Sequence, residues 1–139
     1  MVSKVFVDTS AWISYCLFAQ PKHSTIKNLI KKMIKTGIII CTSNDVIDET
    51  ITRLIYDANP LVVKKFINYI SKSIETGNLI QLWVDQQIQE EAFKLAEKFI
   101  EHKLSLTDAT TLVLMDKFKV EAVITLDSDF KKVGASVLP

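Results

Sequence analysis

The chain has 139 residues, of which 48% are hydrophobic and 24% charged, and it contains only three glycines and three prolines. Because a domain of about this length buries roughly two thirds of its unfolded surface, these proportions exclude a disordered chain. They predict a single domain over residues 1–139, with short loops. The formal net charge of +1 excludes the strongly basic class of nucleic-acid-binding domain, so any contact with nucleic acid must be local.

Neither a disulfide framework nor a membrane span is expected. Cys16 and Cys41 lie in apolar surroundings, and two cysteines are too few for a disulfide-stapled domain, so we expect inert buried thiols. No apolar stretch approaches the roughly 20 residues that cross a bilayer, and residues 1–8 lack the apolar core of a signal peptide. These features predict a cytoplasmic protein with no membrane contact.

In chain order, the pattern of apolar residues predicts a short buried strand at residues 5–7, followed by a helix capped by Thr9 or Ser10. A second helix is predicted from residue 24 to residue 37, because its apolar residues recur on one face. A buried strand is expected next, at residues 38–41.

The middle of the chain has the pattern of a helical hairpin over residues 45–76, with Ser43 or Asn44 as the expected cap of its first helix. The two helices are separated by Asn59-Pro60, which ends the first one. A third strand is predicted at residues 79–84.

The last third of the chain predicts two helices and two strands. Asp85 is the expected cap of a helix that reaches about residue 103, and Thr107 the expected cap of a helix that reaches about residue 119. A strand at residues 122–126 and a short one at residues 135–138 complete the prediction. Apolar strands that alternate with amphipathic helices indicate an α/β fold with three α/β/α layers and a mostly parallel sheet of four to five strands.

Acidic residues follow or flank the predicted strands in four separate segments. Asp8 and Asp127 come after strands, Glu49 lies in the helix after the second strand, and Asp108 lies in the first turn of a helix. The carboxyl ends of parallel strands meet at one edge of a sheet, where ligands usually bind. Each acid alone could be an ordinary helix cap, but the four together predict a carboxylate cluster.

Such a cluster needs a cation or protons, because two carboxylates about 4 Å apart repel by roughly 4 kcal/mol at an effective dielectric of 20. Mg²⁺ or Mn²⁺ suits carboxylate oxygens, and the isolated His23 and His102 offer no zinc spacing. A metal held this way can activate water and neutralise a phosphoryl oxygen, which predicts phosphodiester hydrolysis. Covalent catalysis by Thr9 or Ser10 is disfavoured, since no basic side chain is near them in sequence.

These segments also resemble the motifs of a known family. They are, in chain order, residues 5–12 (VFVDTSAW), 43–49 (SNDVIDE), 104–109 (LSLTDA) and 123–130 (VITLDSDF). On these motifs the chain is similar to the PIN-domain nucleases, and in length and layout to the VapC-type toxins of toxin–antitoxin pairs. The resemblance covers nearly the whole chain.

The resemblance implies a PIN-like fold, a ribonuclease activity and a set of site residues. The implied metal ligands and catalytic residues are Asp8, Glu49, Asp108 and Asp127. Ser10 or Thr125 would hydrogen-bond the cluster, and Asp129 could assist or replace Asp127. Asp45 shares a helix face with Glu49, and we interpret it as a solvated acid, with a further ligand as the alternative.

The resemblance further implies an RNA substrate, an antitoxin protein as partner and a homodimer, with the predicted hairpin of residues 45–76 as the expected interaction surface. The alternatives are an RNA-processing nuclease outside toxin–antitoxin systems and a non-catalytic RNA-binding or scaffold domain. A phosphatase with Asp8 as nucleophile is disfavoured, because Ser10 stands where such enzymes have a second acid.

A run of lysines without any acid among them lies between residues 22 and 35. We interpret it as a solvated helix face, with local binding of RNA as the alternative. Its members are Lys22, Lys27, Lys31, Lys32 and Lys35.

Overall fold

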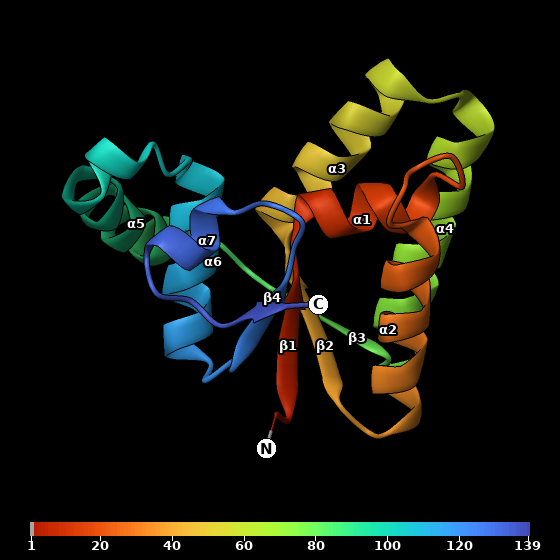
Figure 1. Ribbon diagram of the computed structural model, residues 1–139, viewed down its shortest axis with the longest axis horizontal. Helices are drawn as coiled ribbons and strands as arrows, with labels where there is room; N and C mark the ends of the chain where they lie inside the picture. Colours follow the sequence, from red (N-terminus) through yellow and green to blue (C-terminus); the bar gives the residue numbers. More distant parts are fainter. Residues whose placement is uncertain (1) are drawn as a thin grey trace.

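The computed structural model describes residues 2–139 and has a central sheet of five strands (Figure 1). The strands are β1 (Lys4–Val7), β2 (Ile39–Ser43), β3 (Leu79–Leu82), β4 (Ala122–Ile124) and β5 (Val137–Leu138). All neighbouring pairs are parallel, and their order across the sheet is β3-β2-β1-β4-β5. The predicted parallel sheet is therefore confirmed, and it has five strands, the larger of the two predicted numbers.

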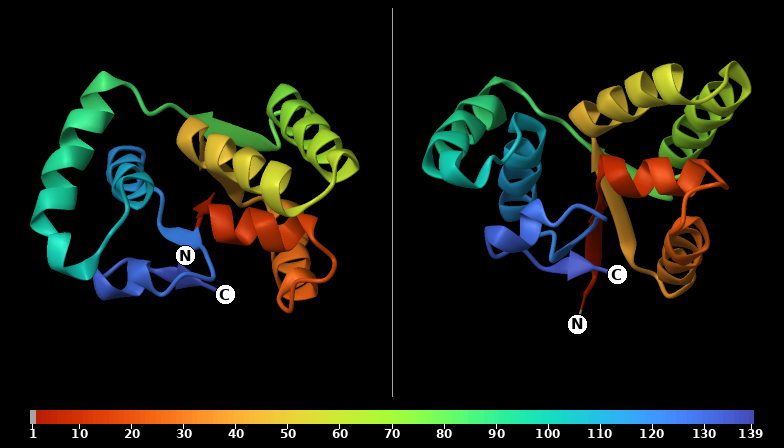
Figure 2. Two further views of the ribbon diagram at one scale, coloured as in Figure 1. Left: turned by 90° about the horizontal axis from the view of Figure 1, so that it is seen from above. Right: turned by 45° about the horizontal axis from the view of Figure 1, so that its top comes forward.

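Helices cover both faces of this sheet. They are α1 (Thr9–Cys16), α2 (His23–Lys35), α3 (Asn44–Asp57), α4 (Pro60–Glu75), α5 (Gln86–Lys98), the 3-10 turn η1 (Ile100–His102), α6 (Leu106–Lys117) and α7 (Asp129–Lys132). The first four lie on one side of the sheet, and α5, α6 and α7 lie on the other (Figures 1 and 2). The three predicted layers are thus present, and α3 and α4 form the predicted hairpin.

Several predicted boundaries were wrong, and the caps explain two of them. Asp8, and not Thr9 or Ser10, is the N-cap residue of α1, and its side chain makes no capping hydrogen bond. Ser105, and not Thr107, caps α6 by accepting a hydrogen bond from the backbone N–H of Asp108. The predicted caps Ser43 and Asp85 are confirmed, since each accepts a hydrogen bond from the N–H three residues later.

The helix after Asp85 is also shorter than predicted. It ends at Lys98 and is followed by η1 and by Lys103, whose positive φ of 54° breaks helical geometry. Strand β3 ends at Leu82 and β4 at Ile124, each two residues earlier than predicted. The residues that follow β4 turn toward the carboxyl edge of the sheet and form the site described below.

The core is centred on β1, whose Val5, Phe6 and Val7 have no exposed surface. Trp12 of α1 packs there with 1% exposure, and its indole Nε1 donates to Thr42 Oγ1 at 3.1 Å. This buried anchor holds α1 against β2, and so fixes the direction in which the chain leaves Asp8.

Both cysteines are free, and Cys41 is buried while Cys16 is half-buried. Burial raises the pKa of Cys16 to about 12 and that of Cys41 to about 11, which agrees with the inert thiols that were predicted. Over residues 2–139, no helix combines the length and apolar character that crossing a membrane requires.

Candidate active site

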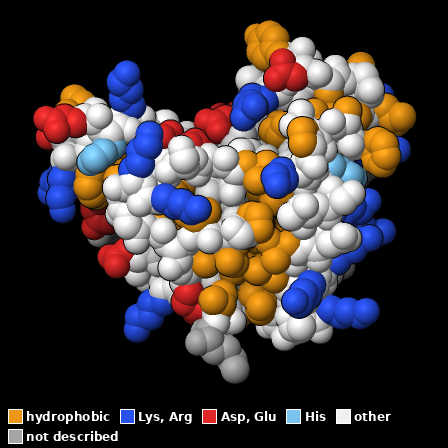
Figure 3. Space-filling view, in the orientation of Figure 1, with side chains coloured by type: hydrophobic (Ala, Val, Ile, Leu, Met, Phe, Trp, Pro, Cys, Tyr) orange, Lys and Arg blue, Asp and Glu red, His pale blue; other side chains and the backbone are white. Residues whose placement is uncertain are grey.

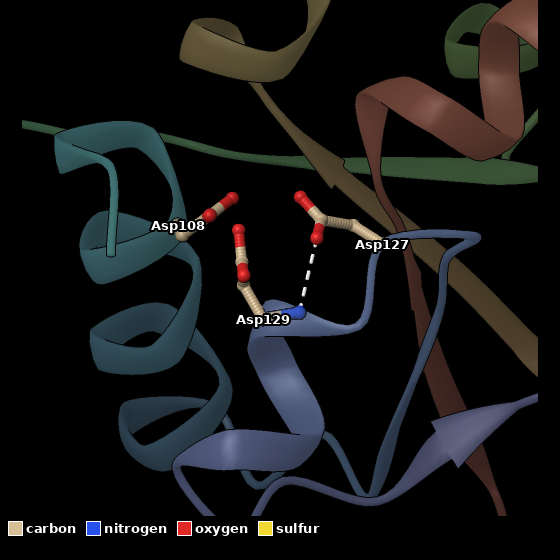
Figure 4. A group of neighbouring side chains, drawn as sticks. All are labelled: Asp108, Asp127 and Asp129. Atoms are coloured by element: carbon tan, nitrogen blue, oxygen red, sulfur yellow. Dashed lines mark hydrogen bonds between the residues drawn. The ribbon is translucent and has the colours of Figure 1, made fainter. Parts of the chain in front are cut away.

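Three carboxylates from the C-terminal third of the chain meet at the carboxyl edge of the sheet (Figure 4). Asp108 is in the first turn of α6, Asp127 follows β4, and Asp129 is the first residue of α7. One carboxylate oxygen from each lies within 4.8 Å of the other two. The backbone N–H of Asp129 donates to Asp127 Oδ1 at 3.0 Å, which fixes the turn between them.

Asp8 lies beside this group and is held by two hydroxyls. Its Oδ2 accepts hydrogen bonds from Thr125 Oγ1 at 2.9 Å and from Ser10 Oγ at 3.2 Å. The same hydroxyl oxygens accept the backbone N–H groups of Asp127 at 3.0 Å and Leu126 at 2.9 Å, respectively. Ser10 and Thr125 therefore tie the end of β1 to the loop after β4, as single hydroxyls that both donate and accept.

The buried carboxyls have raised pKa values. Burial raises the pKa of Asp108 to about 7, and the nearby charges of Asp8, Asp127 and Asp129 add to the effect, against the opposing hydrogen bond with Ser105. Burial also raises the pKa of Asp8, which is 4% exposed, although Thr125, Thr9 and Ser10 stabilise its charged form. Without a cation, this cluster therefore holds a proton near neutral pH.

Glu49 is placed near the cluster but outside its closest group. It is half-buried on α3, and its charge contributes to raising the pKa of Asp8. The tight group contains Asp129 in place of Glu49 and Asp8. Asp108 and Asp127 thus lie together as the motifs suggested, and Asp129 joins them. Asp8 and Glu49 lie outside this group, and the charge of Asp8 acts on Asp108 while that of Glu49 acts on Asp8.

Our interpretation of Asp45 as a solvated acid stays a prediction. Asp45 is half-buried, and its Oδ2 lies 3.5 Å from Thr110 Oγ1, at the outer limit of a hydrogen bond. Burial raises its pKa, and the charges of Asp48 and Glu49 act in the same direction. Asp45, in the first turn of α3, therefore faces Thr110 of α6.

One lysine contacts the cluster. Lys132 Nζ lies 3.1 Å from Asp129 Oδ1, and this hydrogen-bonded ion pair lowers the pKa of Asp129. Four of the five lysines between residues 22 and 35 are exposed, and α2 lies on the other side of the sheet from α6 (Figure 1). Their arrangement agrees with a solvated helix face, and they do not line the acidic cluster.

Sequence reasoning missed Ser105 as a residue that positions the site. Its hydroxyl accepts the backbone N–H of Asp108 at 3.0 Å, so it fixes the turn from which that carboxylate projects. The signal was present in the sequence, because Ser-x-x-Asp at residues 105–108 is the spacing of a helix N-terminal cap.

The donor set fits a hard divalent cation. All candidate ligands are carboxylate oxygens, and several of them are held close together against their mutual repulsion. Mg²⁺ and Mn²⁺ prefer such ligands, whereas zinc sites in proteins usually include histidine or cysteine.

Comparisons with known proteins agree with this geometry. The model of the family described as PIN domain matches residues 5–136. The 23S rRNA-specific endonuclease VapC20 of Mycobacterium tuberculosis, found in two strains, is 25% identical over 131 residues, which cover 94% of this chain and 94% of the relative.

Two solved structures have a similar fold. The crystal structure of VapC20 from Mycobacterium tuberculosis, described as a Sarcin-Ricin loop cleaving toxin, superposes with a TM-score of 0.80 at 24% identity and covers 94% of this chain and 95% of that one. FitAcB from Neisseria gonorrhoeae gives a TM-score of 0.63 at 15% identity, over 97% of this chain and 96% of that one. Since the family model spans almost all of the sequence and the acidic motifs meet at one edge of the sheet, the chain belongs to the PIN-domain family.

Proposed function

We propose that this protein is a divalent-metal-dependent endoribonuclease of the VapC type. The single observation that carries the proposal is the group of Asp108, Asp127 and Asp129, whose carboxylate oxygens lie within 4.8 Å of one another. The relative VapC20, which is named as a 23S rRNA-specific endonuclease, supports the same activity. The metal requirement is our inference from the carboxylates.

In the proposed mechanism, Asp108, Asp127 and Asp129 would hold Mg²⁺ or Mn²⁺, with Asp8 and Glu49 as further candidate ligands. When bound, the ion supplies a water of lowered pKa and neutralises charge on a phosphoryl oxygen. Ser10 and Thr125 orient Asp8 through its Oδ2. The fixed turn from Asp127 to Asp129 keeps two ligands in place, so little reorganisation accompanies the reaction.

We propose RNA as the substrate, and 23S ribosomal RNA as the first one to test, because the relative VapC20 is named as a 23S rRNA-specific endonuclease. The net charge of +1 gives little long-range attraction to RNA. Recognition would therefore depend on contacts close to the cleaved bond and on the metal.

The direct test is cleavage of 23S ribosomal RNA and of a mixed RNA pool by the wild type, with Mg²⁺, Mn²⁺ or EDTA. Asp108→Asn should abolish cleavage, whereas Asp116→Asn, an exposed acid of the same helix, should leave it unchanged. Activity that survives EDTA or Asp108→Asn would overturn the proposed mechanism. A wild type that binds RNA but cuts nothing with either metal would favour the scaffold alternative.

We also propose that the protein is the toxin of a toxin–antitoxin pair. Its expression should then arrest growth, and the arrest should disappear with Asp108→Asn at equal protein level. Normal growth in cells that contain active enzyme would favour an RNA-processing nuclease instead.

An antitoxin and a second copy of the chain are the proposed protein partners. Hydrophobic side chains gather at the outer ends of α3 and α4 and on the loop after α1, where Phe18 is 87% and Tyr56 83% exposed (Figure 3). A hollow of about 640 Å³ between residues 16–20 and 57–62 adjoins them. This surface suits an apolar peptide segment of the antitoxin. Light scattering at micromolar concentration tests the proposed dimer, and the mass of a monomer would refute it.

A further inference from the structure

Trp83 is a large aromatic side chain that the fold leaves in solvent. Its exposure is 64%, whereas Trp12, the other tryptophan, is 1% exposed. Tryptophan is usually among the more buried residues, so an exposed indole needs an explanation. The mechanism described above does not use it.

The backbone of Trp83 lies at the same edge of the sheet as the acidic cluster. Leu82, the last residue of β3, pairs in register with Ser43 at the end of β2. Strand β1 lies on the other side of β2 and ends one residue before Asp8. Neighbouring strands are about 4.8 Å apart, so roughly 10 Å separates β3 from β1 at this edge.

A chain of contacts links Trp83 to Asp108. The N–H of Val84 donates to Asn44 Oδ1, in the first turn of α3, at 2.6 Å. The next residue, Asp45, faces Thr110 of α6 at 3.5 Å, and Asp108 is in the first turn of that helix. Figure 2 shows the linker from β3 to α5 running past the start of α3 and across to the side of the sheet on which α6 lies.

The backbone next to Trp83 is therefore held in place by hydrogen bonds, whereas its indole is largely exposed. Asp85, two residues on, accepts the N–H of Ile88 at 2.9 Å and fixes the start of α5. Several polar residues lie near Trp83 in sequence: Gln81 in β3, Asp85 in the linker, and Gln86 and Gln87 at the start of α5. A flat indole among polar groups suits a nucleobase, which has an apolar face and a polar rim.

We propose that the indole of Trp83 is a stacking surface for a base of the RNA strand that flanks the cleaved bond. The proposal rests on the ribonuclease function proposed above, and it names the single-stranded segment as the part of the substrate that is recognised. Stacking is tolerant of sequence, so Trp83 sets affinity and the path of the strand, and other contacts choose the base.

The test uses tryptophan fluorescence in an Asp108→Asn background, which keeps the RNA intact, with Mg²⁺ present and short oligoadenylate as the probe. Because Trp12 is buried, added oligoadenylate should quench emission from Trp83 and leave that of Trp83→Phe unchanged. Trp83→Ala should weaken binding about 5- to 150-fold, which is the fold-change for roughly 1–3 kcal/mol per stacked base. Trp83→Phe should retain most of the affinity.

The control is Phe118→Ala, which removes an exposed ring after α6, at the opposite edge of the sheet, where the Phe118 carbonyl accepts from Lys4 Nζ, and it should leave binding unchanged. Unquenched emission together with unaltered affinity of Trp83→Ala would overturn the proposal. So would a dimer that Trp83→Ala dissociates without loss of RNA affinity, because the ring would then contact a second copy. If oligoadenylate quenches Trp83 but the wild type cleaves no RNA with either metal, the nuclease proposal is wrong and the stacking contact still stands.

Discussion

Asp108 combines burial with a cluster of like charges, and this makes folding depend on pH. Its pKa is about 7 in the folded protein and 3.8 ordinarily, so the folded state holds a proton that the unfolded state has lost. The free energy of unfolding should therefore fall as the pH rises from about 4 to about 7, and level off above that. The raised pKa of Asp8 acts in the same direction.

We expect metal-free wild type to lose as much as about 4 kcal/mol over this pH range because of Asp108 alone. Asp108→Asn should remove most of that loss and be more stable than the wild type at pH 8 in EDTA. Urea unfolding at pH 4 and pH 8 measures this directly. If the free energy of unfolding of the two proteins depended equally on pH, the pKa of Asp108 would not be raised in the folded state.

Thr125 links two acids through one hydroxyl, donating to Asp8 and accepting from the N–H of Asp127. Thr125→Val keeps the shape of the side chain, but it leaves the N–H of Asp127 without its acceptor and removes one of the two hydroxyl donors to Asp8 Oδ2. We expect the free energy of unfolding to fall by about 1–3 kcal/mol, and RNA cleavage to fall about 10- to 100-fold. Thermal unfolding and initial cleavage rates give the two quantities.

Thr76→Val is the matched control, because Thr76 is exposed and its hydroxyl bonds only backbone carbonyls of α4. It should change stability by less than about 0.5 kcal/mol and leave cleavage unchanged. If Thr125→Val behaved like this control, the hydroxyl network would not orient Asp8.

At the scale of elements, the N-terminus of α6 sets the position of Asp108. Ser105→Ala removes the acceptor for the N–H of Asp108 and should cost about 0.5–2 kcal/mol of stability. Cleavage should fall as well, because the turn that carries the carboxylate loosens. Chemical unfolding and cleavage rates measure the two effects.

Asn59→Ala removes the equivalent cap of α4, which carries no residue of the cluster. It should lower stability by a similar amount and leave the cleavage rate per folded molecule unchanged. Equal losses of activity in Ser105→Ala and Asn59→Ala would show that the effect is general destabilisation.

At the scale of the whole molecule, the fold was largely readable from the sequence. The alternation of apolar strands with amphipathic helices indicates a parallel sheet that is covered by helices on both faces. Val5, Phe6 and Val7 illustrate this, because a strand without polar side chains must be buried on both faces. Boundaries were less predictable. Strand β4 ends at Ile124, and the side chain of the next residue, Thr125, bonds Asp8, 117 positions away in the chain, a contact that the local sequence pattern does not show.

The candidate site was predictable in its residues but not in its grouping. Asp8, Asp108 and Asp127 could be found because they follow strands or begin a helix. The sequence could not show that Asp129 joins the tight group while Glu49 stays outside it, because that depends on how α7 turns after Asp127. Trp83 was missed for a similar reason, since exposure of an apolar side chain next to a buried strand is a tertiary property.

The central claim is that these carboxylates bind a divalent metal, and the most direct test is Mn²⁺ binding followed by the electron paramagnetic resonance signal of the free ion. The wild type should take up Mn²⁺ at pH 7.5, Asp108→Asn should bind it at least about tenfold more weakly, and Asp116→Asn should match the wild type. A wild type that binds no Mn²⁺, or an Asp108→Asn variant that binds it equally well, would contradict the account.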